Sequence, residues 1–278
     1  YDAMGNPIKD VLIERGIDVV RERVDRLNDA DLQRQLWHIQ ASIATIAADE
    51  VETGVPNYEL FATPHKTSQL ISQAKAAADY LCDTAIASDD EAAWIGLQAQ
   101  SEAYWAIGTQ GLDLYSGTPG IALFLAYAGQ VLGEARYTDM ARKGYTATQR
   151  RAEYLSDSII AIGAYEGWGG LIHTFLHLGT LWQDDEILFQ ANRMANRIWG
   201  FIEQDSQYGI VRGSAGAIQA LLALHNVQPA DSQLTLAAMC AERLADEAQQ
   251  QERGVGWPIE RFGERPLAGY AHGASGIA

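Results

Sequence analysis

The chain of 278 residues has few cysteines, few prolines and no long apolar run. Its two cysteines, Cys82 and Cys240, cannot form a disulfide framework, and we interpret each as a buried thiol on a helix. Unpaired thiols fit a reducing compartment, so we expect the protein in the cytoplasm. No stretch approaches the roughly 18 consecutive apolar residues of a membrane span, which predicts that no segment crosses a membrane.

Positive charge is also scarce. The chain carries 20 Lys and Arg against 36 Asp and Glu, a net charge of -16. Phosphate binding needs clustered cations, so this balance argues against a nucleic-acid partner and against docking on anionic lipid. Two interpretations of the acidity stay open. It favours solubility, or it favours a cationic peptide as substrate.

Helical periodicity dominates the rest of the sequence, and alternation typical of β-strands is hard to find. Asn28 and Asp31 predict a helix start before a periodic stretch that includes Leu36 and Ile46. Glycine and prolines predict a loop at residues 51–64. Further amphipathic helices with one charged face are predicted for residues 11–27, 68–88, 138–155, 185–202 and 232–251.

A glycine motif, G-x-x-G, occurs four times, starting at Gly117, Gly167, Gly213 and Gly273. The first glycines are 50, 46 and 60 residues apart, and each motif opens an apolar segment. A helix that is apolar nearly all round must be surrounded by protein. We therefore predict inner helices at residues 121–128, 171–178 and 217–224, each alternating with an amphipathic outer helix. This alternation fits an open α-solenoid or a closed α/α toroid.

Two of these motifs carry a family resemblance. Residues 112–124, Leu-Asp-Leu-Tyr-Ser-Gly-Thr-Pro-Gly-Ile-Ala-Leu-Phe, and residues 269–277, Gly-Tyr-Ala-His-Gly-Ala-Ser-Gly-Ile, resemble signatures of the lanthionine synthetase cyclase (LanC-like) family. The sequence is most similar to the C-terminal cyclase domain of class II, LanM-type, lanthipeptide synthetases. The resemblance implies an all-α fold, an α/α toroid of inner and outer helices. We expect that toroid to be incomplete at the C-terminus, because the chain ends just after the fourth motif.

The resemblance also suggests a division of the chain. Residues 65–278 are similar to the N-terminal part of the cyclase domain. Residues 1–64 look like a helical junction from an upstream dehydratase domain, especially around Leu32 to Trp37.

The family joins a peptide cysteine thiol to dehydroalanine or dehydrobutyrine, forming a lanthionine ring in a ribosomal precursor peptide. Its zinc ion is held by two cysteines and a histidine from later motifs. We expect those ligands downstream of Ala278, so we assign no metal ligand within this chain. The fragment alone is therefore expected to be inactive, although Zn²⁺ and activity are expected in a full-length protein.

His272 matches the family's active-site histidine, and Asp113 matches its acidic residue four positions before the first glycine. The resemblance makes His272 the candidate acid or base, with Asp113 polarising or orienting it. Without the resemblance, a histidine in a glycine-rich turn is more often structural, and Asp113 fits a helix or turn cap. His173 and His177 share a helical face at a spacing that can serve zinc. No third ligand is evident nearby, so packing is favoured for that pair.

The expected partners are a dehydrated, cysteine-containing precursor peptide and a dehydratase domain in the same chain. Two other functions stay open: a LanC-like enzyme that adds glutathione to dehydrated residues, and a non-catalytic α-helical module that binds peptides. Trp168, Trp257 and Tyr270 lie near glycine motifs and are candidates for a peptide groove, although core packing is the commoner role.

Overall fold

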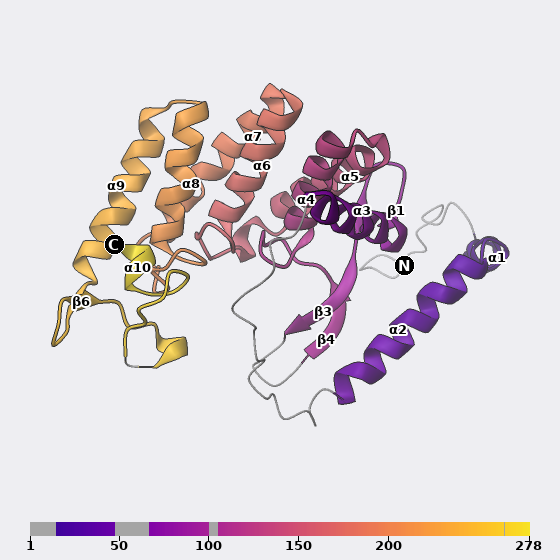
Figure 1. Ribbon diagram of the computed structural model, residues 1–278, viewed down its shortest axis with the longest axis horizontal. Helices are drawn as coiled ribbons and strands as arrows, with labels where there is room; N and C mark the ends of the chain where they lie inside the picture. The colour runs from indigo at the N-terminus through magenta and orange to yellow at the C-terminus, as the bar shows by residue number, and fades with distance from the viewer. Residues whose placement is uncertain (1–14, 48–66, 100–104, 264) are drawn as a thin grey trace, which may run out of the picture. The chain divides into compact units, whose positions relative to one another are not determined.

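The computed structural model describes residues 15–47, 67–99, 105–263 and 265–278 (Figure 1). The chain forms two compact units. One contains residues 1–57 and 97–107, and the other contains residues 58–96 and 108–278. The loop predicted for residues 51–64 lies outside the described residues. The interpretation of residues 1–64 as a junction stays a prediction.

The smaller unit contains helices α1 (Gly16–Asp25) and α2 (Asp29–Ala47). The predicted cap before α2 is confirmed. The Asn28 amide bonds to the carboxylate of Asp31 at 3.1 Å, and the Asp31 amide bonds to the Asn28 side chain at 3.2 Å. This reciprocal pair satisfies amides that the first helical turn leaves without partners.

Three helical hairpins follow one another in the larger unit (Figure 1). Each consists of an apolar helix, a connection of two or three residues and an amphipathic helix. The pairs are α4 (Thr118–Leu132) with α5 (Ala135–Tyr154), α6 (Trp168–Trp182) with α7 (Asp185–Ala195), and α8 (Ser214–Val227) with α9 (Asp231–Asp246). The apolar helix α6 packs against both α4 and α8, so the three apolar helices form one layer. The predicted inner helices are therefore confirmed.

Local sequence explains where these helices begin and end. Helix α4 has Pro119 in its first turn and stops at Gly133, whose φ of 70° is left-handed. Helix α7 is capped by Asp184, whose side chain accepts bonds from two amides of the first turn. Helix α5 buries one face, which includes the small residues Ala141 and Gly144, and exposes most of its charged residues.

The core lies between the layer of apolar helices and the amphipathic helices that pack against it. Its largest fully buried members include Leu125, Leu171, Phe175, Leu178 and Leu221 from the apolar helices, and Tyr137 from α5. Burying a side chain of this size stabilises the fold by about 1.5–3 kcal/mol. A smaller buried cluster containing Tyr208, Trp257 and Ile259 lies beside α8 and α9. The packing of this core thus keeps the apolar helices α4, α6 and α8 side by side.

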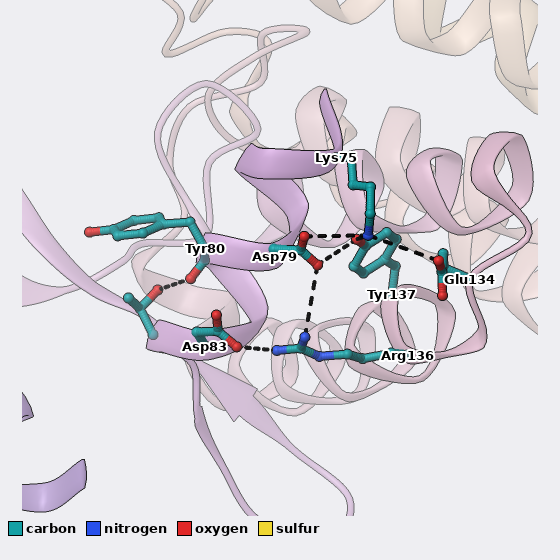
Figure 2. A network of polar contacts seen from close by, with 8 residues as sticks. Lys75, Asp79, Tyr80, Asp83, Glu134, Arg136 and Tyr137 are labelled. Atoms are coloured by element: carbon teal, nitrogen blue, oxygen red, sulfur yellow. Dashed lines mark hydrogen bonds and ion pairs between the residues drawn. The ribbon is translucent and has the colours of Figure 1, made fainter. Parts of the chain in front are cut away.

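Helix α3 (Thr67–Thr84) is joined to α5 by a polar network (Figure 2). The Tyr137 hydroxyl donates to Asp79 at 2.6 Å, and the Lys75 ammonium donates to the same hydroxyl at 3.1 Å. Arg136 bonds to Asp83 one turn further along α3. The bond from Tyr137, followed by those from Lys75, lowers the pKa of the Asp79 carboxyl.

Several predicted helices end earlier than expected. Helix α3 stops at Thr84, before β1 (Ile86–Ala87), which pairs with β2 (Ala92–Ala93). Helix α7 stops at Ala195 and is followed by a 3₁₀ turn, η3 (Ile198–Phe201). Helix α9 stops at Asp246, before β5 (Gln249–Gln250), which pairs with β6 (Val255–Gly256). Of the remaining short elements, η2 (Ser156–Ser158) follows α5, η4 (Glu260–Phe262) follows β6, and α10 (Ala274–Ile277) lies in the last described segment.

A further strand pair, β3 (Ile95–Ala99) with β4 (Trp105–Thr109), was not predicted. These strands are short, and the described chain is mostly helical, so the all-α fold class is confirmed. The closed toroid stays a prediction. Within the described residues, no helix is both long enough and apolar enough to cross a membrane.

Candidate functional site

The loops that precede α4, α6, α8 and α10 form a continuous row, which we call the rim. We define the rim loops as residues 110–117, 161–167, 208–213 and 267–273. The Leu114 amide donates to the carbonyl of Tyr165 at 2.7 Å, joining the first loop to the second. The Ala164 amide donates to Ile210 at 2.9 Å, joining the second to the third. The link from the third loop to the fourth is a 3.2 Å bond from the amide of Val211 to the carbonyl of Ala271.

Glycine allows these loops to lie so close to the helices. Gly167 has a φ of 93°, and a Cβ there would lie 1.9 Å from the carbonyl oxygen of Ala161. Each G-x-x-G motif therefore turns the backbone into an inner helix while its loop bonds to the next loop.

His272 lies in the fourth rim loop, just before α10. Its side chain is partly exposed and packs on Phe262, with ring centroids 4.9 Å apart. The third loop approaches the fourth at Gly209, where an added Cβ would lie 2.9 Å from the Cα of His272. The backbones of Gly209 and His272 therefore lie close together, with little room for a side chain at position 209.

Asp113 lies in the first rim loop. Its carboxylate accepts bonds from the backbone amide of Ser116, at 2.5 Å, and from the Ser116 hydroxyl, at 3.0 Å. These bonds are those of a turn cap, the alternative role considered for this residue.

His272 and Asp113 share the rim, but two other loops lie between theirs in the row of hydrogen bonds. The expected orientation of His272 by Asp113 stays a prediction. Their separate roles as catalytic residues stay predictions.

An ion pair occupies the middle of the rim and was not predicted from the sequence. The Arg212 guanidinium lies 2.6 Å from the carboxylate of Glu166, and both side chains are about one-third exposed. The carbonyl of Arg212 also accepts bonds from the amides of Ile162 and Gly163. Glu166 and Arg212 come from different repeats, so their spacing in the sequence did not indicate that they form an ion pair.

Asp205 is a second residue that sequence reasoning missed. This buried carboxylate accepts bonds from the Ser214 amide at 2.7 Å and the Ser214 hydroxyl at 2.6 Å. It also accepts from the amide of Gln207 at 2.9 Å. It therefore caps α8 from nine residues upstream, too far along the chain for the usual capping pattern to reveal it.

The two cysteines are buried and unpaired, on α3 and α9 respectively. Burial raises the pKa of the Cys240 thiol to about 12, and it also raises the pKa of Cys82. A zinc ligand must be a thiolate, and both thiols favour the protonated form. Within the described part of the chain, no three His, Cys, Asp or Glu residues gather as a metal site. The residues present therefore do not fit the family's zinc site.

His173 and His177 lie on one face of α6, as their spacing predicts, with ring centroids 4.4 Å apart. The Tyr127 hydroxyl, from α4, lies 2.6 Å from Nδ1 of His177. Burial, and next the neighbouring His177, lowers the pKa of His173 to about 4. Burial also lowers the pKa of His177. Both rings are therefore neutral at neutral pH.

The three aromatic candidates for a peptide groove differ in their exposure to solvent. Trp168 and Trp257 are buried, and their indole nitrogens donate to the carbonyls of Ile159 and Leu244 at 3.0 and 2.7 Å. Tyr270 is 59% exposed in the fourth rim loop. Only Tyr270 is thus placed to touch a substrate.

Comparison with known families decides the identity of this helical array. A sequence model of the lanthionine synthetase C-like protein family matches residues 108–278. The chain belongs to the lanthionine synthetase C-like family. The match includes all four glycine motifs, and therefore the whole rim with Asp113 and His272. No curated protein matched the chain significantly.

Proposed function

We propose that this lanthionine synthetase C-like chain takes part in forming lanthionine rings, as the N-terminal part of the cyclase domain of a class II, LanM-type synthetase. The substrate is a ribosomal precursor peptide that carries cysteines and dehydrated serine or threonine residues. The observation that supports the proposal best is the rim. It places a partly exposed His272 among loops that open inner helices, within the region matched by the family.

The reaction defines what the rim must supply. The cysteine thiol gives up its proton to a base or to water, and the thiolate sulfur adds to the β-carbon of dehydroalanine or dehydrobutyrine, forming a C–S bond. The electron pair of the double bond moves toward the carbonyl, giving an enolate. A proton must then reach the α-carbon, so a side-chain acid whose pKa lies near neutral pH accelerates the step. We assign that proton transfer to His272.

Zinc would lower the pKa of the substrate thiol and present a thiolate. The residues described in this chain do not fit the family's ligand set of two cysteines and a histidine. We therefore derive no step through zinc and propose that other residues of the protein hold it. The dehydrated residues require a dehydratase, which we propose acts in the same cytoplasmic protein.

Asp113 has a narrower role in this proposal. Its carboxylate already accepts two bonds from Ser116, so its first effect is to fix the shape of the first rim loop. Any effect on catalysis would then come through the substrate, held between the first and fourth loops.

The test uses the full-length synthetase with its precursor peptide, and compares His272→Ala with a control that removes an imidazole from α2, His38→Ala. Mass spectrometry after thiol alkylation counts free cysteines. We expect His272→Ala to slow ring formation by about 10²–10⁴-fold, the usual contribution of an acid–base group, while dehydration continues.

Three results would count against the proposal. Wild-type cyclisation in His272→Ala would make His272 structural. Glutathione adducts in place of rings would favour the glutathione-adding alternative. Peptide binding by the wild type with neither product would favour the non-catalytic module. Asp113→Asn, run in parallel, separates a slowed reaction from a loosened loop when its melting temperature is measured as well.

A further inference from the structure

A second cluster of chemically capable side chains lies on the inner helices, away from the rim residues just described. It comprises His173 and His177 of α6 and Tyr127 of α4. Both imidazoles are partly exposed, and Tyr127 is 39% exposed, so solvent reaches the cluster. Nothing in the proposed chemistry of ring formation uses these three residues.

The geometry suits two donors to one metal ion. Histidines four residues apart on a helix point the same way, and this spacing holds zinc in known helical motifs. Two nitrogens bound to a tetrahedral metal at 2.0–2.1 Å lie about 3.3 Å apart. Rings whose centroids are 4.4 Å apart, tilted by 36°, can bring their nitrogens to that separation by small rotations.

Tyr127 completes the arrangement from the neighbouring helix. Metal-binding histidines usually bond through their other ring nitrogen to an oxygen, which fixes the orientation of the ring. The 2.6 Å contact between the Tyr127 hydroxyl and Nδ1 of His177 has this form and leaves Nε2 for a metal.

We propose that His173 and His177 chelate a divalent transition-metal ion, with Tyr127 as the outer partner that orients His177. The site has two protein donors and completes its coordination with water, since no carboxylate or thiol joins the pair among the described residues. Imidazole donors favour Cu²⁺, Ni²⁺ and Zn²⁺, and the affinity should be highest for Cu²⁺. The proposal does not depend on ring formation.

The experiment titrates the chelator-treated 278-residue chain with Cu²⁺, and then with Ni²⁺ and Zn²⁺, by calorimetry. His173→Ala, His177→Ala and Tyr127→Phe are compared with the control His38→Ala, which removes an imidazole from α2. We expect Tyr127→Phe to weaken Cu²⁺ binding by about 10–100-fold, as loss of an outer partner does, and either histidine variant to weaken it further. His38→Ala should bind like the wild type.

Electron paramagnetic resonance of the Cu²⁺ complex provides a readout that stability does not affect. We expect coupling to two imidazole nitrogens in the wild type, and to one in His173→Ala. Circular dichroism checks that each variant remains folded. Equal affinity in both histidine variants and the wild type, or a two-nitrogen spectrum that survives in His173→Ala, would place the metal elsewhere and overturn the proposal. No binding by the wild type would overturn it too.

Discussion

Gly216→Ala tests how tightly the rim loops pack against the inner helices. A Cβ at position 216 would lie 2.0 Å from the carbonyl oxygen of Ile210 and 2.3 Å from the amide nitrogen of Ala164. These two atoms are the acceptor and donor of the 2.9 Å bond that joins the third rim loop to the second. Both belong to the backbone, so no side-chain rotation can relieve the clash.

The magnitude follows from three contributions. Overpacking of this kind costs about 1–3 kcal/mol. Losing the bond between the two loops costs about 1 kcal/mol more. Alanine favours a helix over glycine by up to about 1 kcal/mol, which offsets part of the loss, since Gly216 lies in the first turn of α8. The free energy of unfolding should therefore fall by about 1–4 kcal/mol, and the melting temperature by about 2–16 °C for a protein of this size.

The control is Gly200→Ala. Gly200 lies in η3, and a Cβ there meets no atom within 4 Å. Urea and thermal unfolding, followed by circular dichroism, should show little change in this variant. If Gly216→Ala is as stable as Gly200→Ala, the loops are not packed as described, and the rim would lose its structural basis.

Two further outcomes concern buried and networked polar groups. Asp205→Ala should lower the free energy of unfolding by about 2–4 kcal/mol, because the amide and hydroxyl of Ser214 lose their acceptor. The comparison variant Asp113→Ala, measured in the same urea titrations, should lower the free energy of unfolding clearly less. Tyr137→Phe should lower the melting temperature by removing the bond to Asp79. Because this bond lowers the pKa of Asp79, its contribution is present above the carboxyl's ordinary value of 3.8 and is lost as the pH falls through the lowered value. The melting difference from the wild type should thus shrink in acid, and a constant difference would refute the assignment.

The helices could be predicted because their signals are local. Near-continuous apolar segments after each G-x-x-G motif identified α4, α6 and α8, and charged faces identified α5, α7 and α9. Helix ends were less accurate. The last residues of the predicted 232–251 helix pair as β5 with β6, a contact that periodicity does not encode. Strands β3 and β4 were missed because each is only five residues long.

The candidate site was predictable only where a motif carried it. His272 and Asp113 came from the family resemblance, and their positions in the rim agree with the repeat of glycine motifs. Glu166 and Arg212 meet across 46 residues of sequence, and Asp205 caps a helix from nine residues away. Such contacts depend on how the hairpins stack, and no window of sequence contains that information.

The order of the rim loops constrains how the site can work. Each loop bonds to the next, so residues in adjacent loops can interact directly, as Glu166 and Arg212 do. His272 has the third loop as its neighbour, and that loop presents Gly209 to it. Gly209 itself has no side chain, so this position cannot relay a proton from His272. We propose that Asp113, three loops away in this row, acts in the same reaction by holding the other end of a peptide that spans the rim.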